Sequence, residues 1–219
     1  MRKLAAAEFI GLDGVIQAPG GVQEDTGGGF TPGGWTWPNW HDGIGRHFFE
    51  AISHADALLF GRKTWQIHGG AFEPMPNSDP FGAAMNAVRK YVVSNTLRLT
   101  SAWRNSSLIS GNVVNEVRRL KQQARKDILV DGSRVLVHTL IENDLVDEFA
   151  LHVYPLLLGG GKRLCPDGER ADLQLIECQS LPTGVVFQRY RRTWWRLSPA
   201  SGRELPGGDP NDDQGGVKR

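Results

Sequence analysis

The stretch that most constrains the fold is Ala55-Asp-Ala-Leu-Leu-Phe-Gly-Arg-Lys-Thr-Trp65, where a short apolar run stops at a glycine and passes into a helix. An apolar run like residues 57–60 is typical of a strand covered on both faces in an α/β sheet. Gly61 favours a tight turn, because glycine adopts backbone angles closed to other residues. The sequence therefore predicts a buried strand, a turn at Gly61, and a helix that begins with Arg62, Lys63 and Thr64.

Two further strand ends carry small polar residues. Ser94 and Asn95 follow the apolar run before them, and Gly132, Ser133 and Arg134 follow residues 127–130. Ligands of open α/β sheets bind beyond the carboxyl ends of the strands, and helix N-termini bind phosphate through free amides. Two helix starts and one hydroxyl-rich edge suit a dinucleotide. Arg62 and Lys63 suit an additional ribose phosphate, which predicts NADPH as the cofactor instead of NADH.

Alternating apolar patterns predict an α/β fold in which helices and strands alternate first and strands predominate at the end. Residues 181–184, Leu-Pro-Thr-Gly, predict a hairpin connection between the last two strands. The predicted domain covers residues 1–197, and the Gly-, Pro- and Asp-rich residues 198–219 are predicted to form a disordered tail. The expected strands are residues 3–10, 57–60, 90–94, 108–110, 127–130, 145–154, 173–179 and 185–197. The expected helices are residues 41–54, 62 to 69 or 70, 82–88, one that starts at the N-cap Asn112, and 135–142.

Charge and cysteine content exclude several classes of function. The 219-residue chain has a formal net charge of +1, which provides no field for nucleic acid or a membrane surface. No apolar run approaches the length of a membrane span, and Glu8 and Asp13 interrupt the N-terminal apolar run, so a secretory signal is not predicted. The two cysteines lack a C-x-x-C spacing and the histidines lack an H-E-x-x-H pair. We expect a cytoplasmic protein that binds no metal.

Residues 18–40 form a long glycine-rich loop that contains Phe30, Trp35, Trp37 and Trp40. Loops of this length are commonly lids, binding loops or disordered segments. Two interpretations remain open for the tryptophans. They stack on a planar ligand, or they pack the loop onto the domain.

With these residues identified, the chain resembles the dihydrofolate reductase-like superfamily, and within it the RibD C-terminal (bacterial bifunctional deaminase-reductase C-terminal) domain family. Matching segments occur in the family's order over about residues 3–195. They are Gly11-Leu-Asp-Gly-Val-Ile-Gln17, Leu58-Leu-Phe-Gly-Arg-Lys-Thr-Trp65, Val92-Val-Ser-Asn-Thr-Leu97, Ile128-Leu-Val-Asp-Gly-Ser133, Leu145-Val-Asp-Glu-Phe149 and Pro155-Leu-Leu-Leu-Gly-Gly-Gly-Lys-Arg163. The chain departs from the family at Asp131, where RibD domains carry Glu, and at Ser133, where dihydrofolate reductases have a second glycine.

The resemblance implies a mixed, mostly parallel central sheet flanked by helices, with antiparallel C-terminal strands. It also implies NADPH across the strand ends. Arg62, Lys63 and Thr64 would hold its phosphates, Ser94 and Asn95 would lie near the adenosine, and Gly132 and Ser133 near the pyrophosphate and nicotinamide ribose. It also implies a homodimer and a small heterocyclic substrate, either pyrimidine-like, as in riboflavin biosynthesis, or pterin-like.

The reaction adds a proton as well as a hydride, and the sequence offers Asp13, Asp42, His41 or a water as its source. We expect Asp13, although a turn-capping role for this carboxylate remains open. The alternatives to such an NADPH-dependent reductase are a dihydrofolate reductase proper and a protein that binds NADPH without turnover.

Overall fold

The computed structural model describes residues 2–193, so the predicted tail at 198–219 and the last predicted residues of the domain lie outside the described part. Eight strands form one sheet in the order β4-β3-β2-β5-β1-β6-β8-β7. The elements in chain order are β1 (Leu4–Gly11), α1 (Asp42–His54), β2 (Ala55–Gly61), α2 (Arg62–Phe72), α3 (Pro80–Ala87), β3 (Arg89–Val93), β4 (Ser106–Ile109), α4 (Val113–Lys121), β5 (Asp127–Val130), α5 (Arg134–Glu142), β6 (Glu148–Tyr154), β7 (Leu173–Ser180) and β8 (Val186–Arg192).

The sheet is mixed, as the sequence predicts. All pairings among the first six strands are parallel, whereas β8 runs antiparallel to both β6 and β7. The predicted fold class, α/β with a dihydrofolate reductase-like sheet and antiparallel C-terminal strands, is therefore confirmed.

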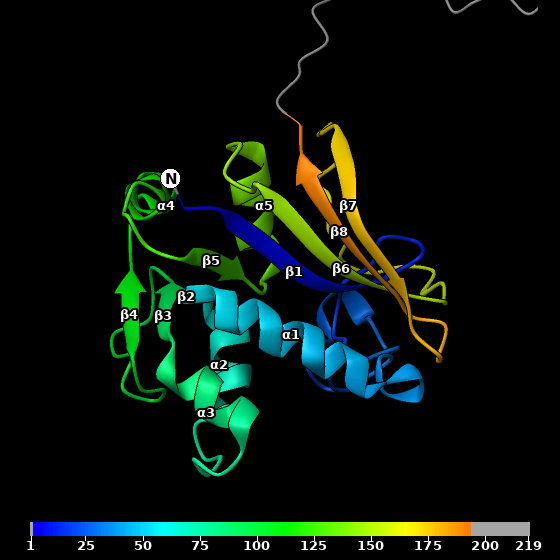
Figure 1. Ribbon diagram of the computed structural model, residues 1–219, viewed down its shortest axis with the longest axis horizontal. Coiled ribbons are helices and arrows are strands. Elements are labelled where there is room, and N and C mark those ends of the chain that lie inside the picture. The colour runs from blue at the N-terminus through cyan, green and yellow to red at the C-terminus, as the bar shows by residue number, and fades with distance from the viewer. Residues whose placement is uncertain (1, 194–219) are drawn as a thin grey trace, which may run out of the picture.

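Helices cover both faces of the sheet and produce a three-layer arrangement. One core cluster joins α4 and α5 to the sheet through buried side chains such as Leu120 and Leu140. A second cluster on the other face includes Ile52 of α1, Trp65 of α2 and Met85 of α3. Figure 1 shows α1 crossing the front of the sheet, with α5 behind it. Burial on both faces explains why the middle strands are almost entirely apolar in sequence.

Several predicted boundaries were wrong by a few residues, for local reasons. The third helix begins at Pro80 instead of residue 82, because the Asp79 side chain caps it by accepting a hydrogen bond from the Gly82 amide at 2.6 Å. The second helix continues past Gly69 to Phe72, because Gly69 packs against the Trp103 side chain instead of ending the helix. The strand predicted at 145–154 begins only at Glu148.

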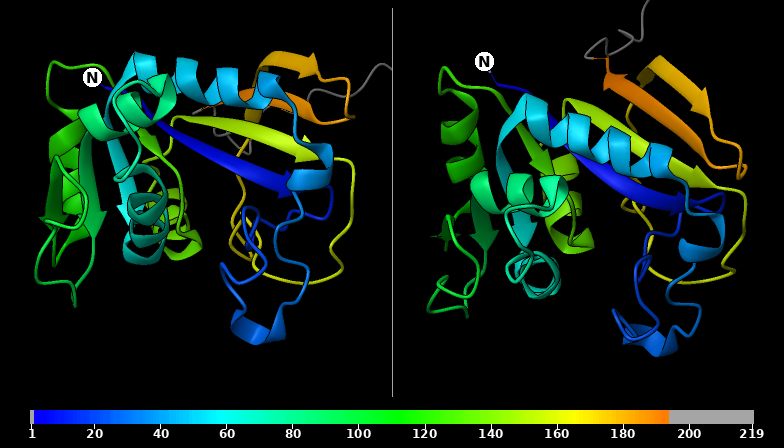
Figure 2. Two further views of the ribbon diagram at one scale, coloured as in Figure 1. Left: turned by 90° about the horizontal axis from the view of Figure 1, so that it is seen from below. Right: turned by 60° about the horizontal axis from the view of Figure 1, so that its bottom comes forward.

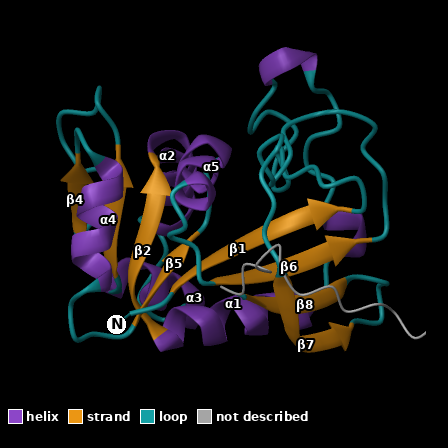
Figure 3. Cartoon of the chain, turned by 90° about the horizontal axis from the view of Figure 1, so that it is seen from above, coloured by secondary structure: helices purple, strands orange, loops and turns teal. Residues whose placement is uncertain are grey.

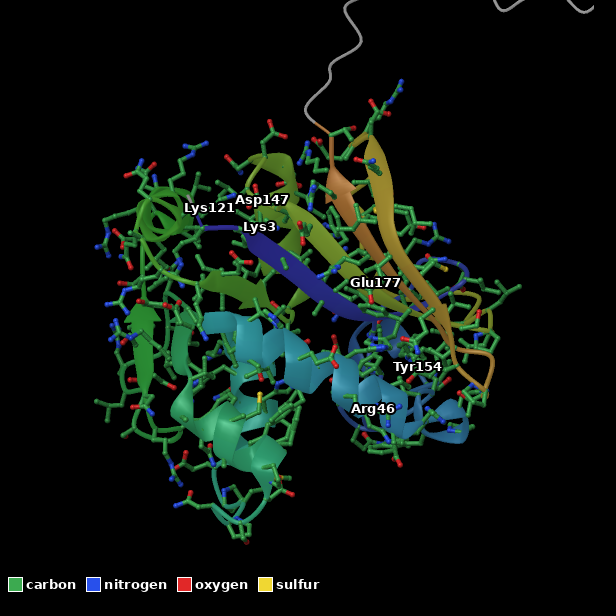
Figure 4. All side chains as sticks on the ribbon, viewed as in Figure 1. Lys3, Arg46, Lys121, Asp147, Tyr154 and Glu177 are labelled. Atoms are coloured by element: carbon green, nitrogen blue, oxygen red, sulfur yellow. The ribbon has the colours of Figure 1, made fainter. Side chains whose placement is uncertain are left out.

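The amino end of β1 is held by a polar network at the opposite end of the strand from the glycine junctions. Lys121 Nζ donates to Asp147 Oδ2 at 2.5 Å, and the same oxygen accepts the Leu4 amide proton at 2.7 Å. Lys3 lies beside this pair in Figure 4, and its Nζ donates to Glu148. These contacts fix the register of β1 against β6 and thereby determine which β1 residue stands at the far tip of the strand.

The strand tips diverge at the other end of the sheet. Beyond Ala6, which pairs with Val130 at the end of β5, strand β1 keeps a partner on one side only, namely β6. Figure 3 shows the tips of β1 and β6 turned away from the tip of β2, where α2 and α5 begin. In Figure 2 the loop at residues 18–40, drawn in blue, extends beyond the tip of β1. A gap therefore opens between β1 and β5 at their carboxyl ends.

Candidate active site

Two of the three predicted junctions meet at this gap. The Gly61 amide donates to the Gly132 carbonyl oxygen at 3.1 Å, which joins the tip of β2 to the tip of β5. A methyl group added at Gly61 would lie 2.3 Å from Ser133 Oγ, and one at Gly132 would lie 2.9 Å from Thr64 Oγ1. Thr64 and Ser133 thus border one shared cleft.

The reason for glycine differs between the two junctions. Gly132 has a φ of +63°, which favours glycine, and the peptide bond to Ser133 is cis. Gly61 has a φ of −71° and a ψ of 156°, which any residue can adopt. The expectation that Gly61 needs special backbone angles was therefore wrong. Glycine is required there because Ser133 approaches so closely.

The helices that start at these junctions lack side-chain caps. Among the α-helices within residues 2–193, α1, α3 and α4 are capped by the side chains of His41, Asp79 and Asn112. The first turns of α2 and α5 receive no such bond, although Thr64 and Ser133 stand beside them. Uncapped amide groups at a helix N-terminus bind anions, and here two such ends adjoin. This arrangement fits a pyrophosphate.

Both helix starts open into a cavity of about 840 Å³ between the strand tips, α1, α2, α3 and the loop at 18–40. Lys63, Thr64, Gly132, Ser133 and Arg134 line it. Arg134 Nε is buried without a hydrogen-bond partner among residues 2–193. Apolar side chains cover much of the remaining wall, and those with rings or sulfur are Phe9, Trp37, Trp40, Phe48, Phe60, Phe72, Met75, Phe81 and Met85.

The third predicted junction lies at the edge of this region. Arg62 is exposed, and its Nη1 donates to Thr96 Oγ1 at 3.1 Å. Ser94 Oγ accepts the amide protons of Thr96 and Leu97, which holds the turn after β3 in place. Asn95 uses its Oδ1 to accept the Gly111 amide proton at 3.1 Å. Arg62 and Ser94 are thus brought together through Thr96, whereas Asn95 serves the next turn.

The two aspartates predicted as proton donors do not line the cavity. Asp13 Oδ2 accepts the amide protons of Leu158 and Gly159, each at 2.8 Å, so this carboxylate holds the turn after β6. Asp42 is exposed in the first turn of α1. The structure thus favours the alternative that assigned Asp13 to a turn, although the turn belongs to a distant segment instead of its own.

The tryptophans of the loop at 18–40 lie in two different surroundings. Trp35 is buried, donates its Nε1 proton to the Gln17 carbonyl oxygen at 2.8 Å, and meets Tyr154 edge to face. Trp37 and Trp40 are 59% and 38% exposed and line the cavity. An ion pair between Asp25 and Lys162 ties the loop to the segment that follows β6. Trp35 therefore packs the loop onto the domain, whereas Trp37 and Trp40 face the cavity.

Sequence reasoning missed the acidic groups of the cavity. Glu8 is 7% exposed and lines the cavity, and its Oε1 accepts the Gly132 amide proton at 3.0 Å. Burial, followed by the nearby negative charge of Asp131, raises the pKa of Glu8 well above its usual value. Burial likewise raises the pKa of Asp131, against the opposing effect of His68, whose Nδ1 lies 3.6 Å from Asp131 Oδ2. The sequence did contain one signal for Glu8, because it is the single charged residue in the otherwise apolar run at residues 4–10.

Neither a metal cluster nor a bilayer-spanning helix is found in the described part of the chain. No group of three or more His, Cys, Asp or Glu side chains within residues 2–193 could hold a metal ion. None of the helices there is long and apolar enough to cross a membrane.

Three solved structures share this fold. A putative riboflavin biosynthesis protein from Shewanella sp. PV-4 aligns with a TM-score of 0.62 and 19% identity, covering 87% of this chain and 99% of that one. A pyrimidine reductase-like protein from Corynebacterium diphtheriae aligns with a TM-score of 0.62 and 12% identity, covering 88% and 92%. Dihydrofolate reductase from Enterococcus faecalis, complexed with NADP(H) and RAB-propyl, aligns with a TM-score of 0.57 and 15% identity, covering 87% and 96%.

Sequence comparison identifies the family. The chain is 32% identical over 145 residues to the uncharacterized protein YyaP of Bacillus subtilis (strain 168), covering 64% of this chain and 75% of that protein. The RibD C-terminal domain family matches residues 2–187. This match means that the chain belongs to the RibD C-terminal domain family, and its fold is of the dihydrofolate reductase-like type.

Proposed function

We propose that this protein is an NADPH-dependent reductase of a small planar nitrogen heterocycle, of the pyrimidine or pterin type. The observation that carries the proposal is the meeting of two uncapped helix N-termini, at Gly61 and Ser133, on one cavity. Membership of the RibD C-terminal domain family and a fold shared with an NADP(H)-bound dihydrofolate reductase support the same assignment.

The residues at the strand tips fit the cofactor. The amides at the start of α2 and α5 would hold the pyrophosphate, with the Thr64 and Ser133 hydroxyls beside them. Arg62 is exposed next to Thr96 and Ser94, where it would pair with the 2′-phosphate. When bound, the reduced nicotinamide supplies the hydride.

The rest of the cavity fits a flat ring. Trp37, Trp40 and Phe48 present aromatic surface to it, and Glu8 and Asp131 supply carboxyl groups that would hydrogen-bond to ring nitrogens. The substrate-side wall therefore suits a heterocycle that carries both an apolar face and hydrogen-bonding nitrogens.

The test is a comparison of cofactors in an arginine variant. Replacing Arg62 by Ala removes a charge-assisted contact worth about 1.5–3 kcal/mol, so we expect NADPH affinity to fall about tenfold or more. NADH affinity should change less than about twofold, since NADH lacks the phosphate that the side chain pairs with. Arg118→Ala, an exposed arginine on α4, is the matched control and should bind both cofactors normally. Equal weakening of NADPH and NADH by Arg62→Ala would contradict the assigned role.

Turnover separates the proposal from its alternatives. NADPH oxidation is followed on adding dihydrofolate, dihydropterin or aminouracil compounds in turn. Oxidation confined to dihydrofolate identifies a dihydrofolate reductase proper, and tight NADPH binding without oxidation by any compound identifies a binding protein. The homodimer and the cytoplasmic location also stay proposals, tested by analytical ultracentrifugation of the full chain and by fractionation of cells.

A further inference from the structure

Glu8 lies on β1 beyond the point where the neighbouring strand β5 ends. Ala6 pairs with the last residue of β5, and Glu8 stands two positions farther along β1, where the strand has lost its neighbour on that side. Its side chain consequently enters the gap between the strand tips. A charged residue at 7% exposure in a central strand is unusual unless it is paired with a cation or has a function.

The two oxygens of this carboxyl group differ in their surroundings. Oε1 is fixed by the Gly132 amide at 3.0 Å, directly at the junction where the helix N-termini meet. Oε2 makes no hydrogen bond to any group within residues 2–193, and Glu8 lines the cavity. Glu8 is therefore held in place by one oxygen and leaves the other for a ligand.

The charges around Glu8 favour its protonated form. Burial, and after it the negative charges of Asp131 and Glu24, opposes ionisation of Glu8 and raises its pKa. Cations also line the cavity, but Lys162 is paired with Asp25. The remaining charged and titratable lining groups are Lys63 and His68 on α2 and Arg134 on α5.

We infer that Glu8 is the residue that gives a proton to the substrate nitrogen during reduction, with Asp131 keeping that proton on Glu8. This inference rests on the proposed function. Bound reduced nicotinamide would supply the hydride to the carbon of a C=N bond and would be left oxidised. Glu8 gives its carboxyl proton to the nitrogen of that bond and is left as the carboxylate. The carboxylate then regains a proton from water. Glu8 acts as the general acid, and Asp131 is a positioning residue.

The first measurement titrates the carboxyl groups without turnover. Full-length protein labelled with ¹³C at the glutamate carboxyl carbon is titrated by NMR with NADP⁺ bound, and Glu8→Gln assigns the Glu8 signal. We expect a Glu8 signal that titrates well above the ordinary glutamate range, and that moves to lower pH in Asp131→Asn. Titration of Glu8 in the ordinary range, or no movement in Asp131→Asn, overturns the inference.

The second measurement follows single-turnover oxidation of bound NADPH against pH, using whichever of dihydrofolate, dihydropterin or an aminouracil the unaltered protein reduces. The unaltered protein should lose rate as pH rises through the Glu8 titration. Glu8→Gln should be at least about 100-fold slower with a flat pH profile and unchanged NADPH affinity, because general acids contribute about 10²–10⁴-fold. Glu142→Gln, an exposed carboxylate at the end of α5, is the control and should match the unaltered protein.

The outcomes separate failure of the role of Glu8 from failure of the proposed reductase function. A Glu8→Gln rate within about threefold of the unaltered protein, or a pH profile unchanged in that variant, overturns the role of Glu8 and leaves the reductase standing. Failure of the unaltered protein to bind NADPH or to oxidise it with any compound overturns the proposed function, and the proton step with it. Should Glu8→Gln fold poorly, the pH profile of NADPH oxidation by Asp131→Asn decides. It must move to lower pH, and an unmoved profile overturns the inference.

Discussion

Gly61→Ala tests whether the two helix starts are coupled through their direct contact. The added methyl carbon would lie 2.3 Å from Ser133 Oγ, 3.0 Å from Ser133 Cβ and 3.1 Å from the Ser133 amide nitrogen. Rotation of the hydroxyl relieves the first contact only. The other two atoms move only if the start of α5 shifts, and the backbone bond from the Gly61 amide to the Gly132 carbonyl resists that shift.

The expected cost combines two opposing effects. Overpacking of a well-filled site costs about 1–3 kcal/mol. The backbone angles at Gly61 are open to alanine, so the stiffer unfolded chain returns about 0.4–1 kcal/mol. We expect a net loss of about 1–2 kcal/mol in the free energy of unfolding, and about tenfold or more in NADPH affinity, because the displaced amides are those that face the phosphates.

The control lies in α2, the helix that begins directly after Gly61. Gly70 is exposed on α2, and a methyl group there would meet nothing within 4 Å. Gly70→Ala should therefore raise the free energy of unfolding by up to about 1 kcal/mol and leave NADPH affinity unchanged. Urea denaturation and fluorescence titration of NADPH measure both variants. If Gly61→Ala and Gly70→Ala had the same stability and the same affinity, the close approach of the junctions would have no energetic consequence and the reasoning would fail.

Three other predictions concern the surroundings of the site. Lys90 is fully buried and donates to the carbonyl oxygens of residues 85, 86 and 88, so Lys90→Met should lose about 1–3 kcal/mol in urea denaturation at pH 7 by leaving those acceptors unpaired. Burial, and then the charge of His47, lowers the pKa of His152 to about 3. As pH falls below about 6.5, His152 is protonated in the unfolded chain but not in the folded one, so the free energy of unfolding falls. His152→Phe should flatten that decline, which has a slope of at most about 1.4 kcal/mol per pH unit, and thermal denaturation from pH 7 to pH 4 measures it. Lys162→Met removes the ion pair with Asp25 and should speed proteolysis within residues 18–40, whereas an unchanged cleavage rate would mean that other contacts hold the loop.

Local chemistry determined most of what the sequence predicted. The strand, glycine and helix at 55–72 follow from a run of apolar residues and a break, and both signals lie within a few positions of each other. The same holds for α4, where the predicted cap Asn112 accepts the Asn115 amide proton at 3.0 Å. The mostly parallel order of the sheet was instead an implication of the family resemblance, which rests on the ordered set of matching segments.

Contacts between distant segments determined what the sequence did not reveal. Asp13 bonds amides 145 and 146 positions away along the chain, so its role in the turn at Leu158 cannot be read from its neighbours. Lys90 is similar, since a lysine at the start of a strand looks like a solvated residue until α3 folds its carbonyl oxygens over it. In both cases a polar residue serves backbone groups that only the tertiary fold delivers.

The location of Glu8 follows from the lengths of its neighbouring strands more than from its own sequence. Strand β5 ends at Val130 and β6 continues to Tyr154, so β1 has a full partner on one side and a short one on the other. A carboxyl group two positions past the shorter partner has no strand opposite it on that side, is only 7% exposed, and accepts the Gly132 amide proton. The junction that would receive the phosphates thus also orients the acid. Cofactor binding and proton delivery therefore depend on one turn, and a disturbance of that turn should affect both together.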